Sequence, residues 1–179
     1  MNKLQSIILG LFSLLICSSA AFSGIELQIK SLLDNQVELK IPKDFTIMSE
    51  KLMKVKYPSE RRPTLVYTNK SGGINVTLNL TKNKASQDLI PTFVNEFVNS
   101  FKNAYPSAKW KVSGVKEING RKVGVLELIT PALDTPIYNL IFFTDLNGQL
   151  LICSFNCTEK NITKWEPIAE EIILSLKIK

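Results

Sequence analysis

The chain has 179 residues, contains no histidine and carries a formal net charge of +6. Without histidine it cannot contain a histidine-based catalytic triad, and it lacks the commonest zinc ligand. Its apolar fraction of 45% is ordinary for a globular protein, and the length suits one domain with its own core. The lysines are spread along the chain without forming a basic helix, so the charge favours anionic partners over nucleic acid.

The N-terminus has the features of a secretory signal peptide. Lys3 precedes an apolar run, Ile7 to Cys17, that is followed by small residues. At about 11 residues the run is short for a membrane span, which needs about 20. We therefore predict a signal peptide at residues 1–23 and a single exported domain at residues 24–179, located in the periplasm or secreted, most naturally by a Gram-negative bacterium. Loss of the signal peptide, with its one lysine and no acid, lowers the net charge to +5.

Two questions about this segment stay open. Small residues at the −3 and −1 positions allow cleavage after Ala20 or after Ser23. Cys17 also lies in a sequence similar to a bacterial lipobox, but the residue before it, Ile16, is bulkier than the usual glycine, alanine or serine. An envelope lipoprotein anchored through Cys17 is therefore an alternative, and membrane contact is expected only in that case.

Two alternating apolar runs open the mature chain, over residues 25–29 and 37–41, and they flank Asp34 and Asn35. This pattern around an Asx-rich turn predicts a β-hairpin. Pro42 ends the second strand, because proline cannot donate a hydrogen bond to a strand ladder.

A short helix is expected over residues 49–56, ended by Pro58, and a strand over residues 64–68. A longer strand is expected over residues 74–81, where apolar and polar residues alternate. The alternation predicts a half-buried strand with one polar face. The polar set is Asn75, Thr77, Asn79 and Thr81.

The first long helix is expected from Leu89 to Tyr105. Large apolar residues recur every four positions along it, which predicts an amphipathic helix packed on a sheet. This stripe comprises Leu89, Phe93, Phe97 and Phe101. Asp88 is a candidate N-cap, and Pro91 then lies in the first turn, where proline is tolerated.

Two more hairpins follow. Residues 110–118 and 122–130 flank Asn119–Gly120, the strongest short hairpin signal in the chain. Residues 137–144 and 149–155 flank a second turn. We expect these hairpins to supply the pairing of an antiparallel sheet.

The second of these turns, Asp145 to Gly148, faintly resembles a calcium loop but lacks the later glutamate, so a turn without metal is predicted. Leu150 to Cys153 are apolar on both faces, which is typical of a central strand. The C-terminal helix is expected within residues 158–176, with its regular part starting at Pro167. The predicted fold class is therefore α+β, an antiparallel β-sheet flanked by helices.

Cys153 and Cys157 are the two cysteines of the mature chain. Four residues of extended strand span about 13 Å, whereas bridged Cα atoms lie about 4.4–6.8 Å apart. Two buried thiols are expected if both lie in one strand, and a small-loop disulfide if the chain turns near Asn156.

Several segments carry a family resemblance: Lys56 to Thr68, Asn119 to Glu127, Tyr138–Asn139 and the strand–helix unit from Leu150 to Leu176. Together with the order of elements they resemble the PsbP-like α/β/α sandwich, and among its members the DcrB-like exported envelope proteins of bacteria. The resemblance spans the mature chain. It implies a binding or assembly role without catalysis. No cofactor or metal is expected, because the chain has no P-loop or Rossmann fingerprint and no histidine.

The best binding candidate is a basic segment with an aromatic residue, formed by Lys54, Lys56, Tyr57, Arg61 and Arg62. Arginine offers paired donors to carboxylate or phosphate, and tyrosine offers a rigid amphipathic contact. A solvated loop with its arginines paired to local acids is the alternative.

We therefore expect an exported, non-catalytic binding or assembly protein of the bacterial envelope, whose partner is an envelope protein or an anionic ligand. The rival hypothesis is a thiol-dependent envelope enzyme that uses Cys153 or Cys157, because a helix N-terminus near these residues would lower a thiol pKa.

Overall fold

The computed structural model describes residues 24–58 and 62–179. The predicted signal peptide, Cys17 and Arg61 therefore lie outside the described residues, and the domain boundary remains a prediction. In chain order the elements are β1 (Leu27–Leu32), β2 (Val37–Pro42), β3 (Thr46–Ile47), α1 (Glu50–Lys56), β4 (Leu65–Thr68), β5 (Asn75–Lys84), α2 (Ile90–Ala104), β6 (Lys109–Ile118), β7 (Arg121–Thr130), β8 (Ile137–Leu146), β9 (Gln149–Thr158), a 3-10 turn (Glu159–Asn161), α3 (Ile162–Leu174) and β10 (Lys177–Ile178).

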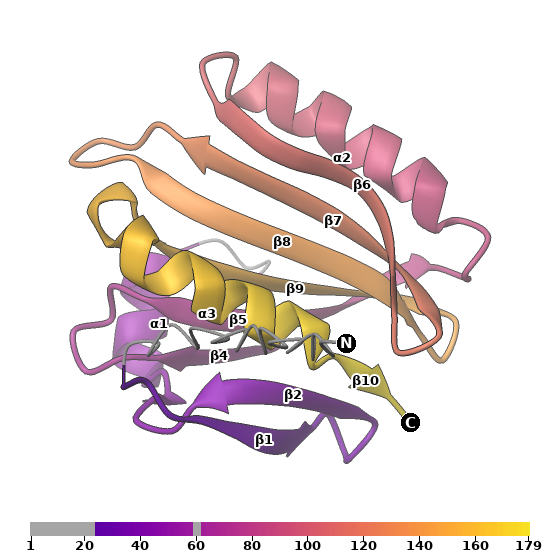
Figure 1. Cartoon of the computed structure of the whole chain (residues 1–179), viewed down its shortest axis with the longest axis horizontal. Helices are drawn as coiled ribbons and strands as arrows, with labels where there is room; N and C mark the ends of the chain where they lie inside the picture. Colours follow the sequence, from indigo (N-terminus) through magenta and orange to yellow (C-terminus); the bar gives the residue numbers. More distant parts are fainter. Residues whose placement is uncertain (1–23, 59–61) are drawn as a thin grey trace, which may run out of the picture.

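The described chain forms a large antiparallel sheet and a small one (Figure 1). The large sheet has the strand order β3-β4-β5-β9-β8-β7-β6, and the small sheet has the order β1-β2-β10. The hairpins predicted from turn residues form with the expected partners, and both two-residue turns place asparagine and glycine at positive φ: Asn119–Gly120 and Asn147–Gly148. The fold class is α+β with an antiparallel sheet between helical layers, as predicted.

One face of the large sheet is closed by α3 together with the small sheet (Figure 1). Trp165 of α3 packs against Phe45 and stacks on Phe155, with ring centroids 5.6 and 5.7 Å apart. The inward residues of β2, Val37 and Leu39, have no exposed surface. This face therefore carries the main core of the protein, and we call it the α3 face.

A single buried acid lies among the described residues of the α3 face. Glu127 of β7 is 5% exposed and accepts a hydrogen bond of 3.0 Å from the Tyr138 hydroxyl. Lys111 lies 3.5 Å from the Glu127 carboxylate and also pairs with Glu166 of α3. Burial raises the pKa of Glu127, because the charged form loses solvation.

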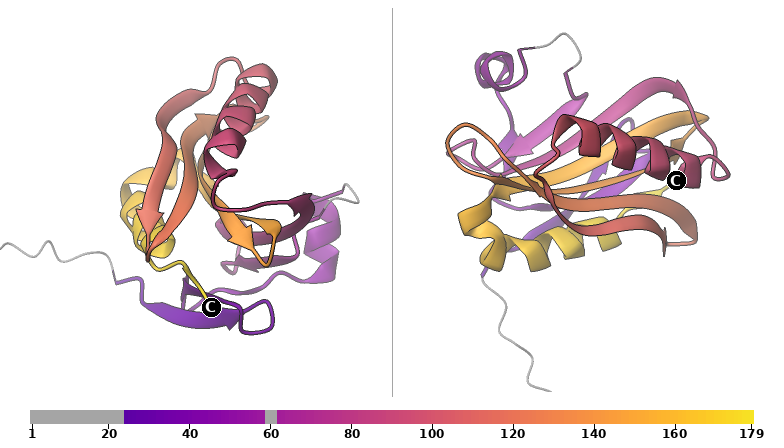
Figure 2. Two further views of the ribbon diagram at one scale, coloured as in Figure 1. Left: turned by 90° about the vertical axis from the view of Figure 1, so that its right-hand side faces the viewer. Right: turned by 90° about the horizontal axis from the view of Figure 1, so that it is seen from above.

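The helix α2 covers the other face of the large sheet over β6, β7 and β8, and we call this side the α2 face (Figures 1 and 2). Phe97 of α2 meets Phe143 of β8 edge to face, with centroids 4.8 Å apart. The Phe143 ring lies over Gly124, where a Cβ would come within 2.2 Å of it. Glycine at position 124 therefore leaves room for the Phe143 ring, against which Phe97 packs.

The predicted N-terminal hairpin forms, and it pairs with β10 in the small sheet, a partner that the sequence pattern did not reveal. Two local expectations were wrong. Asp88 is not the N-cap of α2: Leu89 holds that position without a side-chain bond, while Asp88 lies 3.9 Å from Lys122. The helix α3 starts at Ile162, with Pro167 inside it, because burial of its apolar side outweighs one missing amide donor.

Candidate functional site

Polar side chains line the half of the α2 face that the helix leaves uncovered. We call this set the polar floor: Asn75, Thr77, Asn79 and Thr81 of β5, Asn139 of β8, and Ser154 and Asn156 of β9. Strand register brings these residues together, because Asn75 and Asn139 both stand opposite Asn156, and Thr77 stands opposite Ser154. Cross-strand neighbours on one face lie within side-chain reach. The floor is therefore a continuous surface built from three adjacent strands.

The hydrogen bonds of the polar floor leave one buried atom without a partner. The Asn75 amide donates to Asn156 Oδ1 over 3.1 Å, and the Thr77 and Ser154 hydroxyls are 2.7 Å apart. Asn75 is only 5% exposed, yet within the described part of the chain its Oδ1 has no hydrogen-bond partner. A buried acceptor left unpaired costs about 1–3 kcal/mol, so the Asn75 carbonyl oxygen is a poorly satisfied group of the polar floor.

Three hollows lie along the polar floor. The first, of about 490 Å³, is lined by Asn75, Asn139 and Asn156, and its lining also includes Tyr57 and Tyr105. The second, of about 250 Å³, continues from Asn139 under α2 and is more apolar; its lining includes Phe97, Phe101, Ile141 and Ile152. The third, of about 500 Å³, lies further along β5 and is lined by Arg62, Asn79 and Thr81. In the left view of Figure 2, α1 and α2 stand apart on this side of the sheet.

The structure brings part of the predicted basic segment to the rim of this surface. The Lys56 side chain at the end of α1 donates to the carbonyl of Gly72 and lines the first hollow beside Tyr57. Arg62 Nε donates to the Tyr57 carbonyl over 2.9 Å and lines the third hollow. Lys54 is exposed on α1 and lines none of the three hollows. Burial raises the pKa of Tyr57, so its phenol stays neutral.

Local sequence explains why α1 holds this position. Ser49 caps the helix by accepting a bond of 3.4 Å from Leu52 N. Asn69 Oδ1 accepts from the amides of Gly73 and Ile74 and so fixes the turn that faces α1. The helix cap and the turn together hold Lys56 at the rim, because its ammonium donates to the Gly72 carbonyl within that turn.

The sequence pattern predicted the polar residues of β5 but not the residues of β8 and β9 that complete the polar floor. Asn139 and Ser154 also alternate with apolar residues in predicted strands, which is the same signal that singled out Asn75 and Asn79. Asn156 continues that alternation because β9 runs beyond the predicted end at residue 155. Their proximity depends on strand order, since β5 pairs with β9 across about 80 residues of chain, as shown by Asn75 opposite Asn156.

The two cysteines lie on the α3 face, away from the polar floor. Cys153 and Cys157 both belong to β9, both are 1% exposed, and neither is bridged. A disulfide is ruled out in this arrangement because the strand stays extended between them. Burial raises the pKa of both thiols, that of Cys157 to about 12. The expected lowering by a helix N-terminus is therefore wrong, because loss of solvation dominates.

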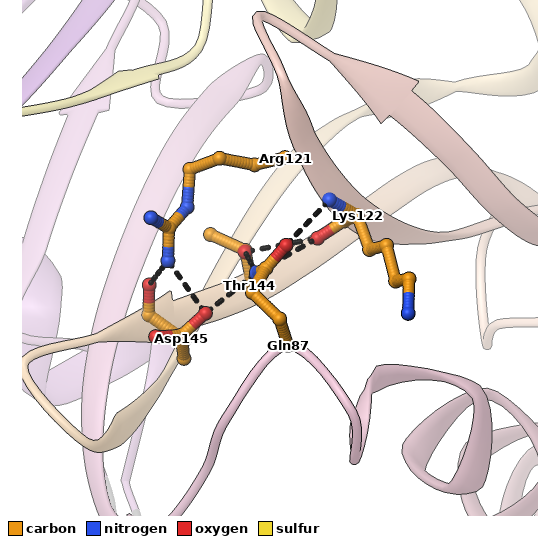
Figure 3. Close-up of polar contacts among 5 residues, drawn as sticks. All are labelled: Gln87, Arg121, Lys122, Thr144 and Asp145. Carbon is orange, nitrogen blue, oxygen red and sulfur yellow. Dashed lines mark hydrogen bonds and ion pairs between the residues drawn. The ribbon is translucent and has the colours of Figure 1, made fainter.

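A second polar cluster joins Gln87 to Arg121, Lys122, Thr144 and Asp145 (Figure 3). Gln87 Nε2 donates to Asp145 Oδ1 over 2.6 Å and to Thr144 Oγ1 over 3.0 Å, and Gln87 Oε1 accepts from the Lys122 amide over 2.7 Å. Arg121 donates to the same Asp145 oxygen over 2.6 Å. The cluster anchors the loop before α2 to the β7 and β8 ends. Asp145 lies near the end of β8 and forms an ion pair with Arg121 there.

Within residues 24–58 and 62–179, no group of three or more acidic, cysteine or histidine side chains could hold a metal ion. In the same ranges, no helix is long and apolar enough to cross a membrane.

No protein-family model matches the chain, and no curated protein matches it. Several solved structures are similar to the chain. The solution structure of cyanobacterial PsbP from Synechocystis sp. PCC 6803 aligns over 92% of this chain and 99% of its own, with a TM-score of 0.61 and 16% identity. The chain has the PsbP-like fold.

Two other similar structures come from bacteria. LpqN of Mycobacterium tuberculosis, described as involved in cell envelope biogenesis, aligns over 88% of this chain and 92% of its own, with a TM-score of 0.54 and 11% identity. A Pseudomonas aeruginosa protein of unknown function, described as a putative regulator, aligns over 86% and 97%, with a TM-score of 0.50 and 13% identity. At these identities the PsbP-like match establishes the fold, and function has to be argued from the site.

Proposed function

We propose that this chain is an exported, non-catalytic binding protein of the bacterial cell envelope, and that it holds its ligand on the polar floor. The observation that carries the proposal is the Asn75 amide, which is buried beside a hollow of about 490 Å³ and has an acceptor without a partner among the described residues. Ligand sites commonly have volumes of about 300–1,000 Å³ and a few converging polar groups.

The chemistry of the surface supports binding over catalysis. The polar floor consists of amides and hydroxyls, which neither exchange protons near neutral pH nor act as nucleophiles without a neighbouring base. The chain contains no histidine to serve as that base. The cysteines lie on the opposite face of β9 with raised pKa values, which argues against a thiol enzyme.

The envelope location rests on two supports. The first is the predicted signal peptide at residues 1–23. The second is the PsbP-like fold, which the chain has in common with LpqN, a protein described as involved in cell envelope biogenesis. The partner proposed here is an envelope component, and the cations Lys56 and Arg62 at the rim favour one that carries an anionic group. Arg61 belongs to the same proposal from the sequence alone.

Site-specific photocrosslinking in an exporting bacterial host tests this proposal. A benzoylphenylalanine would replace Asn79 on the polar floor and, as the matched control, exposed Glu170 on the outer side of α3. We expect adducts from position 79 that are absent at position 170, identified by the mass added to the protein. Equal adducts at both positions, or none at either, would refute the polar floor as the binding surface.

A further inference from the structure

Basic residues occur along the whole chain, but their excess over acids is concentrated in one segment. Of the 22 basic and 16 acidic residues of the chain, residues 50–84 contain eight and two, and the remainder is balanced with 14 of each. The segment runs from the start of α1 to the end of β5 and therefore accounts for the whole net charge of +6. Its basic residues are Lys51, Lys54, Lys56, Arg61, Arg62, Lys70, Lys82 and Lys84.

Ion pairing also distinguishes this segment from the rest of the molecule. Elsewhere, lysines pair with acids on neighbouring elements, as Lys40 of β2 does with Glu171 of α3 over 2.5 Å. Lys51, Lys54 and Lys70 are exposed, and none of them forms an ion pair with a residue that the structure describes. Their charge is not neutralised within the described protein, so it attracts a negatively charged partner.

The helix α1 and the turn at residues 69–73 bring four of these lysines to one place. Lys56 at the end of α1 donates to the carbonyl of Gly72, and a Cβ on Gly72 would lie 2.9 Å from the Leu52 side chain. The turn therefore packs directly on α1, and its lysine joins those of the helix. We call this set the basic end: Lys51, Lys54, Lys56 and Lys70.

The basic end also carries apolar side chains that the fold leaves in solvent. None of the residues of α1 is buried, and Val55, between two of the lysines, is 73% exposed. Ile47 of β3, just before the helix, is 61% exposed. The right view of Figure 2 shows α1 projecting from the body of the domain. Lysines interleaved with exposed apolar side chains suit the surface of a lipid bilayer, which offers both phosphate groups and hydrocarbon.

We propose that the basic end docks the domain on a bilayer that contains anionic phospholipids. The lysines contact the phosphate groups, and Val55 enters the boundary between headgroups and acyl chains. Lysine suits this contact, because a compact charge on a long apolar stem needs no fixed partner geometry. A soluble polyanion would use the lysines alone and leave Val55 in water.

This contact differs from the one considered for the N-terminus, because it needs no lipid anchor at Cys17. It is also independent of what the polar floor binds. Lys56 lines the first hollow as well, so docking through α1 holds that hollow beside the lipid surface. The domain would then present its polar floor next to the membrane.

Vesicle cosedimentation tests the inference with a charge-matched control. The secreted protein is mixed with phosphatidylcholine vesicles that either contain or lack phosphatidylglycerol, and we expect it to sediment only with the anionic ones. Lys51→Glu/Lys54→Glu should bind at least about tenfold more weakly. Lys116→Glu/Lys122→Glu changes the net charge equally, but on the β6–β7 hairpin at the opposite end of the molecule, and should lose far less (Figure 1).

A second matched pair separates a bilayer from a soluble polyanion. Val55→Ser should weaken binding to the anionic vesicles about threefold or more, because an apolar side chain no longer enters the lipid. Val115→Ser on β6, where the valine is 42% exposed, is the control and should bind as the wild type does. Thermal melting checks that all four variants fold.

Three results would overturn the membrane inference. The first is no binding to the anionic vesicles, and the second is an equal loss in the two double variants. The third is a Val55→Ser variant that binds as the wild type does, which would indicate a soluble polyanion in place of a bilayer. Crosslinking from position 79 is unaffected by any of these results, so the proposed binding role of the polar floor is tested separately.

Discussion

The two faces of the large sheet are made from the same strands but are closed to different degrees. On the α3 face, a helix and a second sheet bury nearly every inward side chain, and the largest fully buried residues include Tyr138, Phe142 and Phe155. On the α2 face, one helix covers β6 to β8 and leaves Asn75 and Asn156 beside open hollows.

This difference separates stability from binding within one domain. Buried apolar area is the main source of folding free energy, so the α3 face supplies most of it. The uncovered half of the α2 face keeps hydrogen-bonding groups that contribute little to folding. Changes on the two faces should therefore act on different measurements, and the five predictions below run from the largest expected effect to the smallest.

Truncating the same residue type on each face should give very different losses of stability. Phe155→Ala removes a ring packed between Tyr138 and Trp165, and we expect it to lower the free energy of unfolding by about 3–5 kcal/mol. Phe101→Ala, at the half-buried end of α2, should cost less than half as much. Urea unfolding of both variants measures the difference, and equal losses would contradict the contrast between the faces.

The thiols of the α3 face should be unreactive in the native protein. Burial raises the pKa of Cys157 from 9.0 to about 12, so its thiolate population at neutral pH is about a thousandfold smaller than that of a free cysteine. The Cys153 side chain is buried to the same extent. Iodoacetamide at pH 7.5 should modify both cysteines only in denaturant, as read by mass spectrometry. The exposed control Ser100→Cys should be modified in the native protein. Modification of native Cys153 or Cys157 at the rate of this control would support the thiol-enzyme hypothesis.

Removing the Gln87 side chain should loosen the loop that leads into α2. Gln87→Ala deletes the bonds to Asp145, Thr144 and the Lys122 backbone, and we expect a loss of about 1–3 kcal/mol in unfolding free energy. Ser86→Ala, one residue earlier and exposed, is the control and should change little. If both variants unfold alike in urea, the cluster does not anchor the loop.

Two carboxylates should give opposite slopes of stability against pH. Glu127 has a raised pKa in the folded protein, so its protonated form stabilises the fold below about pH 4.5. This stabilisation is lost as the pH rises through the pKa of the folded state, and Glu127→Gln should remove that pH-dependent loss of stability. The pKa of Glu38 is lowered by its bond to Lys179, so its contribution is present at higher pH and is lost as the pH falls below about 4.5. Urea midpoints of Glu127→Gln and Glu38→Gln between pH 3 and 7 would show whether the signs differ.

The smallest effect on stability is expected on the polar floor. Asn75→Val removes one hydrogen bond to Asn156 but also an unpaired buried acceptor, so the free energy of unfolding should change by less than about 1 kcal/mol. The same variant should lose ligand binding. A large loss of stability would mean that the Asn75 amide belongs to the core and not to a site.

Local sequence signals predicted most of the elements. The Asn119–Gly120 turn adopts positive φ as that dipeptide favours, and the aromatic stripe of α2 packs on the sheet through Phe97. These signals succeed because turn chemistry and apolar periodicity act over a few residues. The start of α3 and the N-cap of α2 were wrong, because packing and the Gln87 cluster overrode the local preference.

By itself the sequence determined the hairpins, the amphipathic helices, the polar face of β5 and the absence of histidine chemistry. Only the tertiary structure decided that Asn75, Asn156 and Asn139 form one row, that α2 stops short of it, and that Cys153 and Cys157 are enclosed on the opposite face. The reason is that strand order pairs segments far apart in the chain, and no local pattern records which strand lies beside which.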